Sequence, residues 1–146
     1  MTKTAKYHQV LLDTGPLVAI LTPNESEHHS CSETLAQIEP PLLTCWPVLT
    51  EAAWLLRRDI AAVRTLLATG RDGWFSILDL NSNDLREMER LLTDYEDLSP
   101  QLADVTLLHL AQRENLNTVF TLDKRDFTVF RFKGKKRLRL LPDENA

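Results

Sequence analysis

Four acidic residues stand at positions from which their carboxylates could act together. Asp13 directly follows the apolar run Val-Leu-Leu, and Asp123 directly follows Val-Phe-Thr-Leu, so both acids come where a short buried strand is expected to end. Glu51 in PVLTEAAWLL and Asp104 in SPQLADVTLLHLA lie near the starts of segments with helical spacing. Where strands alternate with helices, strand carboxyl ends and helix N-termini share one edge of the sheet, so we expect the four carboxylates to converge.

Converging carboxylates repel one another unless cations lie between them, and hard divalent ions such as Mg²⁺ and Mn²⁺ prefer oxygen ligands. Two or three carboxylates and water satisfy such an ion and leave a position open for a phosphate oxygen. The ion then lowers the pKa of a bound water, which can hydrolyse a phosphodiester. The four acids therefore predict a metal-dependent nuclease, in which Thr14 and Thr121 orient a carboxylate or a water.

Each acid also has a simpler interpretation. Asp13 before Gly-Pro and Asp123 in Thr-Leu-Asp-Lys-Arg-Asp fit turn or cap residues. Glu51 fits an ordinary helix residue, and Asp104 fits a partner for the helix dipole. The nuclease hypothesis therefore depends on the set of four and not on any one acid.

The elements that must position these acids alternate between strand and helix. We expect strands at Val10–Leu12, Leu42–Cys45, Trp74–Leu80, Thr118–Leu122 and Leu138–Leu141, and helices over 16–21, 25–38, 47–57, 82–95, around 63–67, and from Ser99 and Pro100 to about Ala111. This order predicts an α/β fold, a three-layer α/β/α architecture with a central, mostly parallel five-stranded sheet. We expect residues 1–146 to form a single domain.

The composition fits one globular domain, with 146 residues of which 43% are hydrophobic. No apolar run approaches the roughly 18 residues that span a bilayer, and the first nine residues are polar, so we expect a cytoplasmic protein without a membrane segment. Cys31 and Cys45 lack a paired spacing and are interpreted as reduced, half-buried thiols. His28 and His29 with Cys31 are disfavoured as a zinc site, because adjacent histidines on a helix project in different directions.

The charge is unevenly distributed. The chain carries 17 basic and 21 acidic residues, and six of the basic residues lie in RFKGKKRLR, between Arg131 and Arg139. This strip either guides a polyanion or protects an edge strand from aggregation. We interpret His109 as a helix side chain. Trp46, Trp54 and Trp74 are interpreted as core or interface anchors, although an exposed one could stack on a base.

The segments LLDTGPLVAIL, PVLTEAAWLL and DLSPQLADVTLLHLAQRENLNTVFTLDKRDF resemble, in this order, the successive motifs of PIN-domain proteins, particularly the single-domain, VapC-type ribonuclease toxins. The resemblance spans Val10 to about Phe130. It implies a PIN-like fold and a magnesium- or manganese-dependent endoribonuclease, often dimeric and often neutralised by a small antitoxin. The acidic quartet of the family maps onto Asp13, Glu51, Asp104 and Asp123. Thr121 matches the hydroxyl residue before the last acid, and Asp126 matches a variable position, which makes it a secondary ligand at most.

The leading hypothesis is therefore an endoribonuclease that uses a metal-activated water. The residues expected to guide the RNA backbone are Lys124, Arg125, Lys135, Lys136 and Arg137. One alternative is a catalytically weak or inactive PIN-like module that binds RNA or protein. Another is a phosphoacceptor domain of the receiver type, which expects an acidic pair after the first strand, whereas Asp13 is followed by Thr14 and Gly15.

Overall fold

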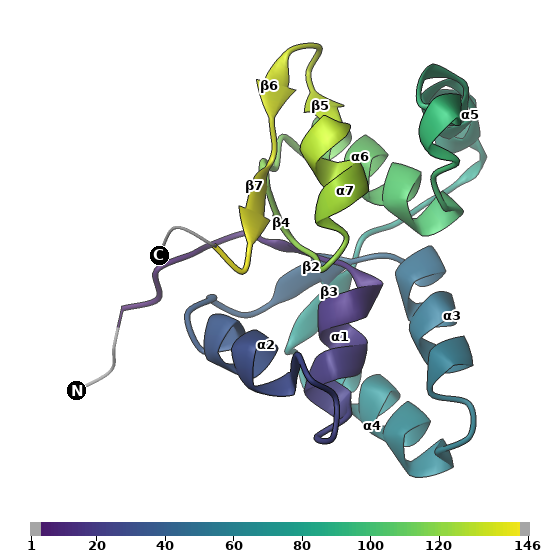
Figure 1. Ribbon diagram of the computed structural model, residues 1–146. Helices are drawn as coiled ribbons and strands as arrows, with labels where there is room; N and C mark the ends of the chain where they lie inside the picture. Colours follow the sequence, from purple (N-terminus) through teal and green to yellow (C-terminus); the bar gives the residue numbers. More distant parts are fainter. Residues whose placement is uncertain (1–3, 144–146) are drawn as a thin grey trace.

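Five short, mostly apolar strands form the centre of the molecule (Figure 1). The computed structural model describes residues 4–143. The strands are β1 (Leu11–Leu12), β2 (Leu42–Thr44), β3 (Phe75–Ile77), β4 (Thr118–Phe120) and β7 (Arg139–Leu141), in the spatial order β3-β2-β1-β4-β7. All four pairings between neighbours are parallel. The predicted central parallel sheet of five strands is confirmed.

Helices cover both faces of this sheet. They are α1 (Thr14–Leu21), α2 (His28–Leu35), α3 (Trp46–Leu55), α4 (Ile60–Arg71), α5 (Leu85–Asp94), α6 (Leu102–Glu114) and α7 (Lys124–Val129), with short 3₁₀ helices η1 (Ser82–Asp84) and η2 (Glu96–Leu98). The connections from β1 to β2 to β3 place α1, α2 and α4 on one side of the sheet, while α5, α6 and α7 lie on the other (Figure 1). The three-layer α/β/α prediction is therefore confirmed.

The strands β1 and β4 and the helix α6 lie at the centre of the core. Leu11 in β1 and Val119 and Phe120 in β4 are fully buried, as expected for strands covered on both faces. In α6 every residue over 103–111 is buried, because this helix lies between the sheet, α3 and α5. Truncation of one buried leucine lowers the free energy of unfolding by about 2–5 kcal/mol. The many buried residues of α6 therefore hold this helix, and the side chains that it carries, firmly in place.

The direction in which successive strands are added to the sheet reverses between β1 and β4. From β1 the connection leads to β2 on one side, and from β4 it leads to β7 on the other, so β1 and β4 flank the switch point of the sheet. The backbone amide of Asp13 donates to the carbonyl of Phe120 across this point at 2.9 Å. Open parallel sheets bind ligands beyond the strand ends at such a point.

Several local predictions differ from the structure. The helix expected from Ser99 begins at Leu102, because Ser99 adopts a left-handed conformation with φ +48 and Gln101 becomes the N-cap. The expected 25–38 helix is reduced to α2. A two-stranded antiparallel hairpin, β5 (Arg131–Phe132) and β6 (Lys136–Arg137), precedes β7 and was not expected.

Burial corrects two further predictions. Cys31 and Cys45 are fully buried rather than half-buried. Trp46, Trp54 and Trp74 are each more than half exposed, so the interpretation as core anchors is wrong. In the part of the chain that the structure describes, no helix is both long and apolar enough to span a bilayer.

Candidate active site

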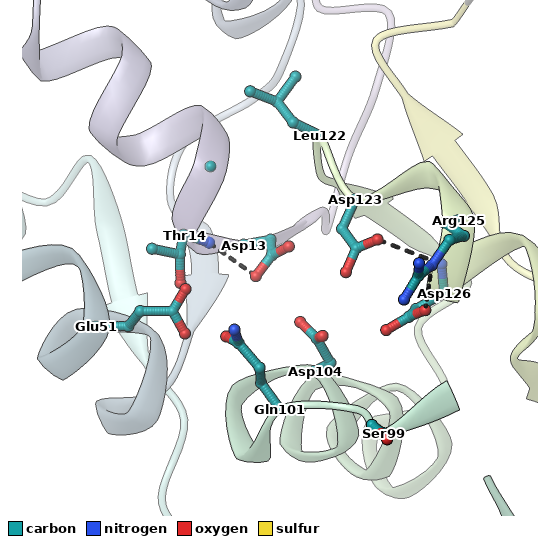
Figure 2. A pocket seen from close by; sticks show the side chains of 11 residues that line it. Asp13, Thr14, Glu51, Ser99, Gln101, Asp104, Leu122, Asp123, Arg125 and Asp126 are labelled. Carbon is teal, nitrogen blue, oxygen red and sulfur yellow. Dashed lines mark hydrogen bonds and ion pairs between the residues drawn. The ribbon is translucent and has the colours of Figure 1, made fainter. Parts of the chain in front are cut away.

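A pocket of about 390 Å³ opens at the carboxyl ends of β1 and β4 (Figure 2). All four acids of the predicted quartet line it, together with Asp126. The other lining residues are Thr14, Gly15, Ser99, Gln101, Leu122 and Arg125. The acids come from the β1–α1 and β4–α7 turns and from the helices α3 and α6, so segments far apart in sequence meet at the switch point as predicted.

Asp13 is the N-cap of α1 and is almost fully buried. Its Oδ1 accepts from the Thr14 amide at 2.8 Å, and its Oδ2 accepts from the Thr121 hydroxyl at 2.7 Å. Burial raises the pKa of this carboxyl to about 6, although both hydrogen bonds favour the ionised form, and Glu51 and Asp123 raise it further. The two bonds fix the orientation of the carboxylate, as the sequence predicted for Thr121.

Asp104 lies in the first turn of α6 and is 6% exposed. Its pKa is raised to about 8, first by burial and then by the charges of Asp13, Asp123, Asp126 and Glu51. Within residues 4–143 its carboxylate has no cationic partner, and Figure 2 shows it facing Asp123 and Asp126 across the pocket. The dipole of α6 favours a negative charge here but does not offset this repulsion.

Asp123 and Asp126 occupy the start of α7. Asp123 is its N-cap, and its Oδ1 accepts from the Asp126 amide at 3.3 Å. The Thr121 hydroxyl accepts from the amide of Asp123 at 2.9 Å, so one threonine positions both strand-end acids. One carboxylate oxygen from each of Asp104, Asp123 and Asp126 lies within 4.8 Å of the other two. Asp126, expected as a secondary ligand at most, is therefore part of the tightest acidic group.

Glu51 and Thr14 form the side of the pocket nearest α3. Burial raises the pKa of Glu51, and the charge of Asp123 adds to this effect. The Thr14 hydroxyl points toward the Glu51 carboxylate and slightly opposes the rise, yet it makes no hydrogen bond of ordinary geometry. Within the described part of the chain, the Thr14 hydroxyl is buried without a partner of ordinary geometry, which costs free energy. Its oxygen is therefore available to a ligand beside the acids.

The donor set fits a hard divalent cation. It consists of five carboxylates and the unpartnered Thr14 hydroxyl, and among the described lining residues only Arg125 carries a positive charge. The Arg125 side chain is largely exposed and its Nε pairs with Oδ1 of Asp126 at 3.5 Å, so a single, solvent-screened cation faces five carboxylates. Oxygen ligands alone suit Mg²⁺ or Mn²⁺ rather than softer metals.

The predicted RNA-guiding residues do not all lie near this pocket. Arg125 lines it, whereas Lys124 donates from Nζ to the carbonyl of Pro142 at 2.6 Å. Lys135, Lys136 and Arg137 lie in the β5–β6 hairpin, which leads into the amino end of β7. Because β7 is parallel to β4, the hairpin lies at the amino ends of these strands, whereas the pocket lies at the carboxyl ends (Figure 1).

Ser99 and Gln101 line the pocket but were missed in the sequence. The segment was expected to be helical from Ser99 on, which would have directed these side chains differently. The left-handed Ser99 instead turns the chain, and the Gln101 carboxamide points into the pocket between Glu51 and Asp104 (Figure 2). A serine before a proline is typical of a turn as well as of a helix start, so Ser99-Pro100 was the one local signal for this turn.

Three of the four histidines have partners outside the pocket. His28 Nδ1 lies 2.8 Å from the carbonyl of Ala19, and His29 pairs with Glu33. His109 Nε2 lies 2.8 Å from Oδ1 of Asp84, away from the pocket. The structure thus places His109 in a packing role on α6, as the sequence indicated.

Comparisons with known proteins agree with this geometry. The model of the family described as "PIN domain" matches residues 10–133. A curated relative, Ribonuclease VapC26 of Mycobacterium tuberculosis, is 26% identical over 135 residues, which cover 91% of this chain and 100% of the relative. The crystal structure of VapC20 of Mycobacterium tuberculosis, a toxin that cleaves the sarcin-ricin loop, superposes with a TM-score of 0.70 at 16% identity, covering 76% of this chain and 87% of that chain.

Proposed function

This chain belongs to the PIN domain family, and from that premise we propose that it is a metal-dependent endoribonuclease and the toxin of a toxin-antitoxin pair. The observation that carries the proposal is the approach of Asp104, Asp123 and Asp126, whose carboxylate oxygens lie within 4.8 Å of one another in a pocket open to solvent. The names of the similar proteins, a ribonuclease and an RNA-cleaving toxin, support the same chemistry.

We assign the binding of Mg²⁺ or Mn²⁺ to this acidic group. Asp104, Asp123 and Asp126 would hold the ion, and Asp13 and Glu51 complete the anionic lining. When bound, such an ion supplies Lewis acidity, which activates water and stabilises charge on a phosphodiester undergoing hydrolysis. The raised pKa values of Asp13 and Asp104 support this assignment, since a cation would relieve the repulsion that contributes to them.

The chain's own residues supply placement and charge. Thr121 and the Thr14 amide hold Asp13, and the N-terminus of α7 holds Asp123, so these carboxylates need no rearrangement when substrate arrives. Arg125 stands at the rim, where its guanidinium can contact an RNA phosphate. The Gln101 carboxamide in the pocket can donate to a phosphate or sugar oxygen.

RNA is the proposed substrate, and a small antitoxin protein is a proposed partner. We also propose a homodimer. The RNA substrate extends to this chain the activity that the names of its relatives print, whereas the antitoxin and the homodimer follow from the family resemblance alone.

Cleavage of RNA in the presence and absence of metal tests the proposal. The purified chain should cut total RNA with Mg²⁺ or Mn²⁺, stop in EDTA and resume when metal is restored. Asp104→Asn should be inactive, whereas Asp72→Asn, which removes an exposed acid at the end of α4, should match the wild type. Binding of RNA without any metal-dependent cleavage would instead indicate a non-catalytic RNA-binding module.

A further inference from the structure

Helix α3 carries an exposed tryptophan beside the pocket. Trp54 follows Glu51 by three residues and is 62% exposed. Side chains three residues apart are neighbours on a helix surface, about 5–6 Å apart at Cβ. The Trp54 indole therefore lies about one helical turn along α3 from Glu51, next to the lining residues and not among them.

One face of this indole carries a cation. The Arg57 guanidinium lies 3.8 Å from the ring centroid, and its Nη1 donates to the carbonyl of Trp54 at 2.8 Å. The hydrogen bond holds the guanidinium against the ring. In the described part of the chain, Trp46 and Trp74 have no such cation over their rings, although both are similarly exposed. Trp54 thus combines an aromatic surface with a positive charge fixed against it.

The charge layout suggests how a polyanion would cross the pocket. Glu51 and Arg125 lie at opposite ends of it (Figure 2). Arg57 follows Trp54 by three residues and Glu51 by six, so its charge lies beyond the Glu51 end of the pocket. An RNA chain that ran from the acidic centre past Glu51 would therefore reach the Trp54 indole and the Arg57 guanidinium, while Arg125 lies on the other side of the centre.

We propose that Trp54 is a stacking platform for one base of single-stranded RNA next to the cleavage position, with Arg57 fixing the ring and contacting the adjacent phosphate. The inference rests on the proposed function, since it takes RNA as the occupant of the pocket. Base–aromatic stacking tolerates any sequence but requires an unpaired base, so Trp54 selects single-stranded regions over duplex.

A competing occupant is a protein surface. Leu55 and Ile60 are also exposed near Trp54, and an apolar partner would cover all three. The Arg57 guanidinium on the ring favours RNA as the occupant over an apolar protein surface, because it can neutralise a phosphate. The experiment separates the two occupants.

Binding is measured with the full chain carrying Asp104→Asn, which prevents cleavage, and a short, labelled single-stranded oligouridylate. Tryptophan emission should be quenched on binding. Trp54→Phe should keep the affinity measured by anisotropy but lose most of the quenching, because phenylalanine still stacks. Trp54→Ala should weaken binding roughly tenfold, the order expected for one lost stack. Trp74→Phe and Trp74→Ala are the matched controls, since Trp74 precedes the amino end of β3, whereas the pocket opens at the carboxyl ends of the parallel strands.

In the otherwise wild-type chain, Trp54→Ala should raise KM for single-stranded RNA roughly tenfold with little change in kcat. Unchanged affinity and KM in Trp54→Ala would overturn the inference, as would the absence of any oligouridylate binding by the parent. A shift in sedimentation of Trp54→Ala at unchanged RNA affinity would assign the surface to a protein partner instead. If the wild type cleaves no RNA but Trp54→Ala still loses binding and quenching, the proposed function fails while the platform stands.

Discussion

Two buried aspartates, Asp104 and Asp84, lie in opposite electrostatic surroundings. Asp104 belongs to α6, and Asp84 in η1 contacts the same helix. Asp104 is 6% exposed and Asp84 is 7% exposed. At the start of the helix, burial and neighbouring acids raise the pKa of Asp104 to about 8. Near its other end, hydrogen bonds from the Asn81 amide, from His109 and from Arg113 lower the pKa of Asp84 to about 2.

The difference separates an acid whose partners the chain supplies from one that we propose to act in the site. The chain itself completes the hydrogen bonds of Asp84, which ties η1 to α6 through Arg113, and Arg113 also donates to the carbonyl of Asp79. Asp104 has only acids for charged neighbours, so its site is complete only with a cation from outside. A buried charge that the fold leaves without a partner is costly, and such a cost is typical of a site that binds something.

The largest expected effect is on catalysis. Asp104→Asn or Asp123→Asn should lower RNA cleavage at least about a hundredfold, on the order of 3 kcal/mol in the barrier, measured as initial rates with Mg²⁺. Asp84→Asn removes an equally buried charge, yet its folded fraction should cleave at nearly the wild-type rate, and so should His109→Ala. Equal losses of rate in Asp84→Asn and Asp104→Asn would erase the distinction between the two sites.

The products of cleavage sharpen this prediction. Hydrolysis by an activated water leaves a 5′-phosphate and a 3′-hydroxyl, whereas attack by the RNA 2′-hydroxyl leaves a cyclic phosphate. End analysis of the cleaved RNA should find the first pair. Cyclic phosphates, or undiminished cleavage in EDTA, would contradict a metal-dependent mechanism while leaving the fold unaffected.

The second effect is on stability. Asp84→Ala should lower the free energy of unfolding by about 2 kcal/mol, because it leaves the Asn81 amide and Arg113 without their acceptor. Asp104→Asn should do the reverse in EDTA, since it removes a charge that the folded state penalises. Urea denaturation of both variants measures the two changes. A loss of stability in Asp104→Asn without metal would show that the buried charge of Asp104 does not destabilise the folded protein.

The third effect is the dependence of stability on pH and metal. The folded pKa of Asp104 is about 8 and that of Asp13 about 6, both above the unfolded value, so the folded state binds more protons between about pH 4 and 8. These groups therefore make the metal-free protein less stable as pH rises through this window. Asp84 acts oppositely, and its contribution is lost only as pH falls toward 2.

Thermal melts in EDTA should accordingly show a higher Tm at pH 6 than at pH 8. Mg²⁺ or Mn²⁺ at ten times Kd should add about 1.4 kcal/mol, and more readily at the higher pH, where the acids are ionised. Asp123→Asn, which removes one of the three proposed ligands, should abolish most of that gain. A Tm that is insensitive to metal from pH 6 to 8 would exclude the acidic group as a cation site.

The smallest expected effect concerns the β5–β6 hairpin. Replacing Lys135, Lys136 and Arg137 by alanine should weaken RNA binding at low salt and flatten its salt dependence, without changing metal binding or kcat. The effect should be modest because the hairpin leads into the amino end of β7, opposite the pocket. An unchanged salt slope would assign these charges to protection of the sheet edge.

The sequence predicted the site best where local signals sufficed. Asp13 and Asp123 each follow an apolar run, and the parallel order of the strands brings such residues to one edge. The place of Asp126 beside Asp104 could not be predicted, because it depends on the first turn of α7 folding back toward α6. The contact of Asp84 with His109 joins residues 25 positions apart, and it depends on how α5 packs on α6, which no local pattern records.

The unpartnered acids of the pocket also have an evolutionary consequence. Most substitutions in a protein destabilise it, and selection against unfolded chains removes them. Exchanging Asp104 for its amide is expected to do the opposite, giving a chain that folds more firmly and no longer cuts RNA. Drift without selection for activity would therefore lead first to inert proteins with an intact fold. An amide or aliphatic residue in place of Asp104 in a descendant would record the time at which its lineage ceased to need the enzyme.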